Sequence, residues 1–447
     1  MAPATRGDRE VIEMGSKPFH LGWFTNYATP VWQGPWSGNE TTSWMDGEFY
    51  VDMAKSMERA GFDFIMLEDS EIVPDAYGES MVKALKYNMS APKLDPVLLL
   101  PAIARETDKL GLVATMTTSF YPPFILARSM QTLDHMTHGR VGWNIVTSSE
   151  DRAAQNFGLD KLYEHDERYE RAEEFTDLVG ELWNSWKPDA LVADYETGTY
   201  TDGDKVEVID FKGTYYSSRG PLNVPPGPQG RPVICQAGSS ERGREFAAKY
   251  AEIILAVPTG LERQKQFRDD IRARMERIGR DPDSCKILFI AEPVLGSTQA
   301  EAEAVWEKMN EPTDANVERG LIGMSTVTDI DFSKFPLDEP LPKDLTTNGH
   351  QSSLKNFYTY GETLRDVAMT WLYHYADKSL VGTPDKVAER MEEMMDYVGG
   401  DGFLMHGPMS RRYISEVCDG LVPALQRRGL TRTSYTHDTL RENLLAF

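Results

Sequence analysis

The segment VICQAGSSERGREFA, residues 233–247, places a glycine and two serines where an apolar run passes into a helix-like stretch. A serine at a helix start accepts a hydrogen bond from an unpaired backbone N–H, so Ser239 or Ser240 could cap the helix. A helix N-terminus also offers N–H donors and partial positive charge, and Gly238 would let an anion approach closely. The segment therefore predicts a capped helix or a phosphate site, and by itself it leaves both open.

A second polar pair lies in the charged stretch YEHDERYERAEE. His165 and Tyr169 are four residues apart, so they share one face of the predicted helix. A zinc site needs a third ligand and usually a general base, which this pattern lacks, so we expect no metal here. Charge density alone favours an exposed helix start. The functional alternative is that both polar tips face an anion near Ser239 and Ser240.

Polar side chains also lie at the ends of other predicted strands, at Asp69, Thr115, Asn144 and His406. No catalytic triad can be recognised among them, so the catalytic residues stay unknown. His406 follows the last predicted strand, where it could belong to the core or to a pocket. Trp23 and Trp36 belong to an aromatic-rich region after the first strand, where packing is the simplest interpretation. The alternative is that these tryptophans, together with His406, line a pocket for a flat, apolar substrate.

Apolar runs of strand length alternate with segments of helical period along most of the chain. The predicted strands cover residues 20–25, 62–67, 112–118, 141–146, 233–236, 252–257, 287–294 and 402–406. Buried strands interleaved with helices indicate a parallel sheet. Eight such units predict an α/β fold, a (β/α)₈ TIM barrel with insertions, whose active site lies at the C-terminal strand ends. A doubly wound sheet is the alternative, but the chain lacks a glycine fingerprint for a dinucleotide.

Two segments interrupt the predicted barrel, which we interpret as a single domain over residues 1–447. Residues 187–230 contain short alternating pieces and the turn sequence PPGPQG, which predict a hairpin excursion. Residues 311–360 are polar and poor in long apolar runs, which predicts a long insertion. Long loops without regular structure are often functional, so we expect this insertion to act as a mobile lid.

The 447-residue chain has a formal net charge of −23, which argues against binding to nucleic acid or to an anionic membrane surface. No apolar run approaches the ~20 residues needed to span a membrane. The start, MAPATRGDREVIEMGSK, lacks the apolar core of a signal peptide. The three cysteines show no CxxC spacing, as is typical of a reducing compartment. We therefore expect a cytoplasmic protein.

Three longer stretches then carry a family resemblance: MTTSFYPPFILARSMQTLDHMTHGRVGWNIVTSS, NFGLDKLYEHDERYERAEEF and PVICQAGSSERGREFA. In this order they resemble the bacterial-luciferase-like flavin monooxygenases. The similar subgroup contains the nitrilotriacetate, EDTA, dibenzothiophene sulfone and long-chain alkane monooxygenases, and also riboflavin lyase. The resemblance covers about residues 20–300 and resumes around 380–440.

The resemblance implies a TIM barrel that uses FMN, as FMNH2, and O2, with FMNH2 supplied by a separate NAD(P)H:flavin reductase. It implies that Ser240, with Ser239 beside it, holds the FMN phosphate, and that His165 and Tyr169 belong to the same cofactor site. Asp69 and Thr115 match residues near the isoalloxazine and its side chain, and Asn144 matches one close to the ring. We also expect a homo-oligomer, either a dimer or a tetramer.

The implied activity is a two-component monooxygenase that oxygenates a small organic substrate through a flavin peroxide, with cleavage of a C–N or C–S bond. Riboflavin lyase, which would convert riboflavin to lumichrome and ribose with FMNH2 and O2, is the first alternative. A deazaflavin-dependent oxidoreductase and a non-enzymatic flavin-binding protein are the others. The loops TNYATPVWQGPWSGNETTSW and EDSEIVPDAYGESMVKALKYNMSAP depart from the relatives and would face the substrate, so they leave the substrate open. No basic clamp for a polycarboxylate is visible near the strand ends.

Overall fold

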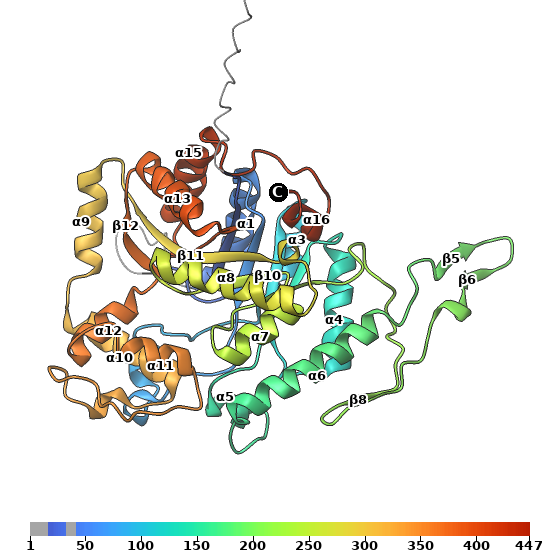
Figure 1. Ribbon diagram of the computed structural model, residues 1–447, viewed down its shortest axis with the longest axis horizontal. Helices are drawn as coiled ribbons and strands as arrows, with labels where there is room; N and C mark the ends of the chain where they lie inside the picture. Colours follow the sequence, from blue (N-terminus) through green and yellow to red (C-terminus); the bar gives the residue numbers. More distant parts are fainter. Residues whose placement is uncertain (1–16, 33–41) are drawn as a thin grey trace, which may run out of the picture.

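The computed structural model describes residues 17–32 and 42–447, and its centre is a closed barrel of eight parallel strands (Figure 1). Around the barrel the strand order is β1-β2-β3-β4-β9-β10-β11-β13, and pairing of β13 with β1 closes the ring. The strands are β1 (His20–Asn26), β2 (Phe64–Glu68), β3 (Gly111–Thr117), β4 (Val141–Val146), β9 (Val233–Gln236), β10 (Ile253–Ala256), β11 (Lys286–Leu295) and β13 (Gly402–Met405). The predicted TIM barrel is confirmed.

Helices follow the strands and cover the outside of the barrel. The covering helices are α1 (Glu48–Ala60), α3 (Pro96–Glu106), α4 (Pro123–Met136), α6 (His165–Trp183), α7 (Glu241–Tyr250), α8 (Leu261–Arg277), α13 (Pro384–Val398), α14 (Arg411–Ser415) and α15 (Val422–Arg427). A π-helical turn, η6 (Glu416–Leu421), joins α14 to α15. No helix in the described ranges is long and apolar enough to cross a membrane.

Side chains alternate between the inside and the outside of the barrel along each strand. Val113 and Cys235 belong to the small apolar cluster inside the barrel, whereas Leu112 and Trp143 pack outward in the larger cluster beneath the helices. The alternation continues to the strand ends. It therefore decides which polar residues can face the C-terminal mouth of the barrel.

The N-terminal end of the barrel is closed by α16 (Leu440–Leu444), whose Leu440 and Leu444 join the inner apolar cluster. A buried ion pair holds this closure in place. Asp63 accepts hydrogen bonds from the backbone N–H of Leu21 at 2.9 Å and from a guanidinium nitrogen of Arg432. The imidazole Nδ1 of His20 lies 3.0 Å from the same carboxylate. The network ties β1, the start of β2 and the C-terminal segment together.

Residues 187–230 leave the barrel and contain two small hairpins that project from it, at the right of Figure 1. Their strands are β5 (Leu191–Asp194), β6 (Thr199–Thr201), β7 (Phe211–Lys212) and β8 (Ser217–Ser218), and η3 (Gly203–Lys205) lies between the two pairs. The hairpins leave Tyr195 and Tyr200 exposed. The second hairpin reaches back to the barrel, where Tyr216 donates a hydrogen bond to the carbonyl of Thr118 at 3.4 Å.

The insertion over residues 311–360 has regular structure, unlike the structureless loop that its polarity suggested. It contains α10 (Asp314–Thr328), η5 (Phe332–Lys334) and α11 (Gln351–Phe357), and with α12 (Leu364–Leu372) it surrounds a separate apolar cluster. It packs on the loop after β2, where Tyr87 donates a hydrogen bond to Glu318 at 2.7 Å. It also contacts α6, where Arg168 donates to the carbonyl of Asn348 at 2.9 Å. Motion as a lid stays a prediction.

Smaller elements complete the chain. They are η1 (Ser43–Asp46), η2 (Tyr77–Glu79), α2 (Val82–Lys86), α5 (Asp151–Asn156), η4 (Pro282–Ser284), α9 (Gln299–Met309) and β12 (Ala376–Gly382). Strand β12 pairs in parallel with the C-terminal half of β11 and so extends the sheet beyond the barrel. The residue before it, Tyr375, thereby comes close to the barrel mouth.

We predict that Asp63→Asn destabilises the protein by about 3–5 kcal/mol, because it leaves Arg432 buried without its carboxylate. Burial alone would raise the pKa of Asp63, but His20 and Arg432 outweigh it, so the pKa is lowered from 3.8. The lowered pKa means that this stabilisation is present above about pH 4 and is lost as the pH falls further. Urea unfolding at pH 7 and at pH 3 measures both effects.

The matched control is Asp419→Asn, which removes the exposed ion pair to Arg59 and should cost less than about 1 kcal/mol. Equal losses of stability in the two variants would contradict the role given to Asp63.

Candidate active site

The sequence-predicted cofactor residues fall on one half of the barrel mouth. Asp69, Thr115 and Asn144 follow or belong to β2, β3 and β4, and Ser240 follows β9, the next strand in the ring. We call these four adjacent strands the first arc, and β10, β11, β13 and β1 the second arc. The structure thus brings together residues that lie up to 171 positions apart in the chain.

Thr115 and Asn144 occupy paired positions on β3 and β4, and both side chains are buried at the inner face. The amide nitrogen of Asn144 donates a hydrogen bond to the Thr115 hydroxyl at 2.8 Å. The amide oxygen of Asn144 is buried and has no hydrogen-bond partner among the described residues. An unpaired buried acceptor is costly, so this atom is suited to accept a hydrogen bond from a ligand.

Ser240 is the N-cap of α7, and its hydroxyl accepts a hydrogen bond from the backbone N–H of Gly243 at 3.1 Å. Capping is therefore one of its roles. The hydroxyl of Tyr169 reaches the same helix start from α6, where a Cβ atom at Gly243 would lie 2.8 Å from it. Ser240 lies close enough to influence the pKa of Tyr169. Burial raises the pKa of Tyr169, so its hydroxyl stays protonated and can donate a hydrogen bond.

Gly238 lets these groups come close together. A Cβ atom at this position would lie 2.2 Å from the amide nitrogen of Gln236 and 3.0 Å from the hydroxyl of Tyr169. The absence of a side chain therefore leaves the N-terminal end of α7 lined by backbone and hydroxyl groups. Backbone N–H groups and the helix dipole favour an anion at such a position. Ser239, one residue before the cap, is partly buried here.

His165 lies beside this helix start. Its ring centroid is 5.2 Å from that of Tyr169, and its Nδ1 lies 2.9 Å from a carboxylate oxygen of Asp166. The imidazole is thus held on the same face as Tyr169, as their spacing in the sequence predicted. The capped helix and the anion site that the sequence left open are compatible in this geometry, because both use the N-terminal end of α7.

The loop after β2 brings carboxylates to the mouth. Burial, opposed by Lys93 and reinforced by Glu68, raises the pKa of Asp69 to about 6. Burial and the neighbouring Asp69 raise the pKa of Glu71 to about 7. Lys93 lies 2.8 Å from Glu68 and is a buried cation in this cluster. The edge of the mouth near β2 therefore carries an excess of carboxyl groups.

The second arc contributes His406, which follows β13, and Glu292, which lies in the upper half of β11. The imidazole Nδ1 of His406 lies 2.9 Å from a carboxylate oxygen of Glu292. The His406 ring is 5.0 Å from the ring of Tyr375 and 6.2 Å from that of Phe24. Phe24 also packs against the inner apolar cluster, so this group faces the inside of the mouth.

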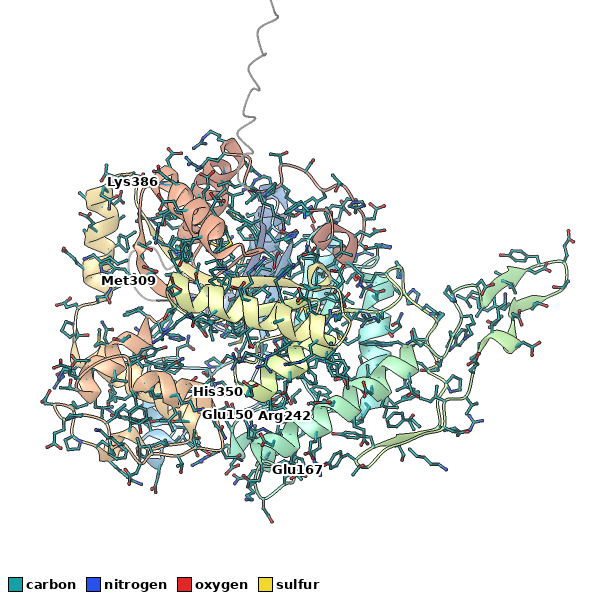
Figure 2. All side chains as sticks on the ribbon, viewed as in Figure 1. Glu150, Glu167, Arg242, Met309, His350 and Lys386 are labelled. Carbon is teal, nitrogen blue, oxygen red and sulfur yellow. The ribbon has the colours of Figure 1, made fainter. Side chains whose placement is uncertain are left out.

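His350, in the insertion, is solvent-accessible although the surrounding protein lowers its pKa by desolvation. Glu150, which follows β4, and Arg168 act electrostatically on the same imidazole. Figure 2 labels His350 and Glu150 where the insertion meets the barrel. The insertion thus supplies part of the wall around the mouth.

Trp23 does not line the mouth. It is fully buried in the outer cluster, with its ring 5.7 Å from that of Phe62 and 6.0 Å from that of Tyr413. Its neighbour Phe24 takes the inward position because side chains alternate along β1. Packing is the interpretation that this placement supports for Trp23, in place of substrate binding. Trp36 lies outside the described residues.

Sequence reasoning missed Glu292, Tyr375 and His350. A signal for Glu292 was present, since a carboxylate inside the apolar run ILFIAEPVL needs a polar partner when buried. Tyr375 and His350 carried no such signal, because they lie in irregular stretches far from the strand that they approach.

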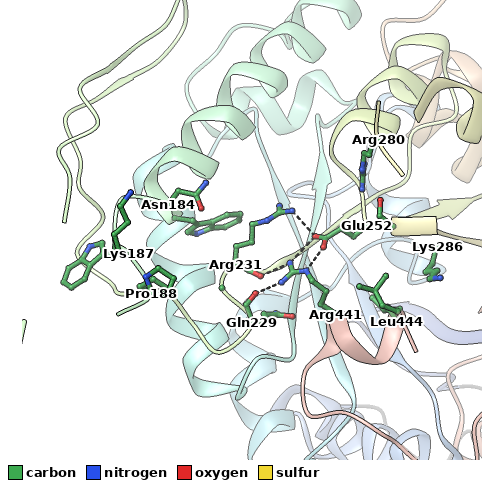
Figure 3. Close-up of a pocket in the computed structure, with 16 residues that line it drawn as sticks. Asn184, Lys187, Pro188, Gln229, Arg231, Glu252, Arg280, Lys286, Arg441 and Leu444 are labelled. Carbon is green, nitrogen blue, oxygen red and sulfur yellow. Dashed lines mark hydrogen bonds and ion pairs between the residues drawn. The ribbon is translucent and has the colours of Figure 1, made fainter. Parts of the chain in front are cut away.

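A groove of about 780 Å³ lies elsewhere, at the N-terminal ends of β9, β10 and β11 (Figure 3). Arg441 donates a hydrogen bond to Glu252 at 2.6 Å within it, and Arg231 lies 3.8 Å from the same carboxylate. Active sites of TIM barrels form at the opposite, C-terminal face. The ion pairs of this groove are accounted for by closure of the barrel, so the candidate site is the mouth.

A known protein family matches most of this chain. The model of the luciferase-like monooxygenase family matches residues 20–402. The chain belongs to the luciferase-like monooxygenase family. This family uses reduced FMN and O2, so the protein is a flavin-dependent monooxygenase and an oxidoreductase.

Among the members similar to it is a dibenzothiophene-sulfone monooxygenase of Rhodococcus erythropolis, 37% identical with 96% of each chain covered. An N-acetyl-S-(2-succino)cysteine monooxygenase of Bacillus subtilis is 36% identical, again with 96% of each chain covered. The crystal structure of a riboflavin lyase with a modified FMN and riboflavin superposes with a TM-score of 0.87 at 32% identity, covering 96% of each chain. These luciferase-like monooxygenases have different substrates at similar identity, so family membership leaves the substrate open.

The first arc fits FMN. The helix start at Ser240 suits a phosphate, and the unpaired amide oxygen of Asn144 suits a ring N–H donor. The amide oxygen of Gln236, at the end of β9, is likewise buried without a partner among the described residues. Phosphate-binding and ring-binding groups thus lie on the neighbouring strands β4 and β9.

We predict that Tyr169→Phe lowers the affinity for FMN by about 1.5–3 kcal/mol, which is roughly 10- to 150-fold, because a hydrogen bond to a charged phosphate is lost. Ser240→Ala should lower the affinity similarly and also cost about 1 kcal/mol of stability, because Ser240 caps α7. Anaerobic titration with reduced FMN and thermal unfolding of the flavin-free protein measure the two effects.

Thr298→Ala is the matched control, since Thr298 caps α9 through its bond to the N–H of Glu301. It should lose comparable stability and keep its affinity for FMN. Equal FMN affinity in wild type and Tyr169→Phe would remove the phosphate role from Tyr169.

We predict that Glu71→Gln stabilises the protein above pH 7 and leaves it unchanged near pH 4. The pKa of Glu71 is raised from 4.5 to about 7, so the stability linked to its neutral form is lost as the pH rises through this range. Glutamine stays neutral at every pH, so the variant keeps this stability above pH 7. Melting temperatures at pH 4, 5.5 and 8 measure the trend, and a wild type more stable than the variant at pH 8 would contradict it.

Asp283→Asn is a control of opposite sign. Arg272 lowers the pKa of Asp283, so the wild type should be slightly more stable than this variant at pH 8, with the difference vanishing as the pH falls.

Proposed function

We propose that this protein binds reduced FMN along the first arc and uses O2 to oxygenate a small organic substrate that enters between the two arcs. The observation that carries the proposal is the start of α7, where Ser240 and Tyr169 meet beside Gly238, on the strand next to Asn144. Ser239 and His165 would complete the phosphate end. Thr115 and Asp69 would lie along the ring and its side chain.

Each group has a definite task in this proposal. Ser240 and Tyr169 donate hydrogen bonds to the phosphate, and the amide oxygen of Asn144 orients the ring. When bound, reduced FMN supplies the two electrons with which O2 is activated. The insertion and the loop after β2 cover the mouth and limit access of water to the reacting groups.

The charge of the mouth bears on the substrate class. Asp69, Glu71 and Glu68 gather at its edge, and Lys93 already pairs with Glu68. A polycarboxylate would be repelled there, so we propose a neutral or cationic substrate that is cleaved at a C–N or C–S bond. Similarity to monooxygenases of dibenzothiophene sulfone and of dimethyl sulfide, which are uncharged organosulfur compounds, supports this class.

Riboflavin lyase activity, giving lumichrome and ribose, is the second candidate. It is supported by the TM-score of 0.87 to a riboflavin lyase and by the aromatic side chains of Phe24 and Tyr375 at the mouth, which could contact a flat ring. A deazaflavin-dependent oxidoreductase has less support, because an F420-dependent alcohol dehydrogenase shares only the fold, at 16% identity.

We propose two kinds of protein partner. An NAD(P)H:flavin reductase would supply FMNH2, as expected for a two-component monooxygenase. Further copies of this chain would form a dimer or tetramer, and the projecting hairpins with exposed Tyr195 and Tyr200 offer a surface for that contact. A cytoplasmic location suits a protein that depends on NAD(P)H.

The test combines the protein with a flavin reductase, FMN and NADH in air, and offers dibenzothiophene sulfone, dimethyl sulfide or riboflavin. We expect substrate-dependent O2 uptake and an oxygenated or cleaved product by mass spectrometry, none of which forms anaerobically. Lumichrome formed from riboflavin in the dark would select the lyase. FMN-independent binding of the deazaflavin, with no O2 uptake, would overturn the proposal.

A further inference from the structure

The second arc carries a histidine–carboxylate pair opposite the residues that fit FMN. Nδ1 of His406 lies 2.9 Å from Glu292, and the imidazole is 32% solvent-accessible whereas the carboxylate is 9% accessible. A carboxylate can only accept, so the contact places the ring proton on Nδ1 and leaves Nε2 on the side away from Glu292. Phe24 and Tyr375 flank the ring at the mouth.

We propose that His406 is a catalytic residue that transfers a proton to and from the substrate, and that Glu292 positions it. This inference rests on the proposed function, because the substrate would lie between FMN on the first arc and His406 on the second. A buried carboxylate that fixes the tautomer and orientation of an imidazole is the arrangement that general acid–base catalysis requires.

The proton transfer belongs to the step after oxygenation. When one oxygen atom has entered the C–H bond beside a nitrogen or sulfur atom, the carbon carries a hydroxyl group. Nε2 takes the hydroxyl proton as the C=O bond forms, and the electron pair of the breaking bond passes to the heteroatom. The imidazolium then returns the proton to the heteroatom. The products are a carbonyl compound and an amine or thiol, with no net change in protons or electrons.

The groups around His406 suit this role. Glu292 is the only carboxylate of the described residues that is hydrogen-bonded to the ring, and it fixes the orientation of the ring. Tyr375, from the segment before β12, packs against the His406 ring, and His374 packs against Tyr375. Burial lowers the pKa of His374 to about 4 and raises that of Tyr375, so both stay neutral near pH 7. Tyr413 donates its hydroxyl proton to the carbonyl of His406 at 2.9 Å and holds the backbone.

The experiment compares the full-length wild type with His406→Gln and Glu292→Gln, using FMN, a flavin reductase and whichever of dimethyl sulfide and riboflavin the wild type converts. Both compounds have the C–H bond beside sulfur or nitrogen that the step requires. We expect His406→Gln to lower kcat for product formation about 100-fold, with less than threefold changes in KM and in FMN affinity. The pH profile of kcat should lose one limb in His406→Gln. Glu292→Gln should lower kcat less than His406→Gln does and should leave KM and FMN affinity unchanged, because the imidazole stays in place but loses the carboxylate that orients it.

His135→Gln is the matched control. His135 lies at the end of α4, away from the mouth, and among the described residues its imidazole is hydrogen-bonded to the carbonyl of Pro225. It should keep the wild-type kcat and pH profile. A kcat for His406→Gln within threefold of wild type, or an unchanged pH profile, would overturn the inference while leaving the proposed function intact.

A readout independent of turnover is the imidazole NMR spectrum of the protein labelled with ¹⁵N-histidine. We expect a downfield Nδ1–H resonance that disappears in His406→Gln and shifts upfield in Glu292→Gln. If the wild type converts neither dimethyl sulfide nor riboflavin, this spectrum alone tests the pair. A resonance unaffected by Glu292→Gln would then overturn the pair separately.

Discussion

The alternation of side chains along eight parallel strands is the constraint on which the site depends. Once the ring of strands is closed, each strand can send only every second side chain inward. Apolar residues such as Val113 and Leu404 fill the lower layers, and polar residues such as Asn144 and His406 take the inward direction near the C-terminal ends. A shift of one residue in any strand would exchange these side chains with those packed beneath the helices.

Closure of the opposite end makes this layering possible. The buried Asp63–Arg432 pair and the two leucines of α16 fill the N-terminal end, which leaves the C-terminal mouth for the site. The mouth is then divided between two arcs of different chemistry. Hydroxyl, amide and helix N-terminal groups lie on β2, β3, β4 and β9, and a histidine–carboxylate pair with two aromatic rings lies on the other side.

The start of α7 shows that a structural and a binding role can share one set of atoms. Ser240 satisfies the N–H of Gly243 and also contacts Tyr169, and the remaining N–H groups of the helix start still point outward. The loop after β2 and the insertion add a different property to the mouth. Their carboxyl groups and His350 have shifted pKa values because protein surrounds them on several sides, which is the expected electrostatic signature of a functional cleft.

The sequence by itself determined the barrel, because the alternation of buried strands and helices is a local pattern that eight successive units repeat. It also determined the family, and it predicted the residues of the first arc, since HDERY and QAGSS are contiguous motifs whose residue types suit an anion. Only the tertiary structure decided that Phe24 faces the mouth and Trp23 the helices, because neighbouring aromatic residues look alike until the strand register is known. It also decided that Glu292 meets His406, since 114 residues separate them and only the pairing of β11 with β13 brings them together.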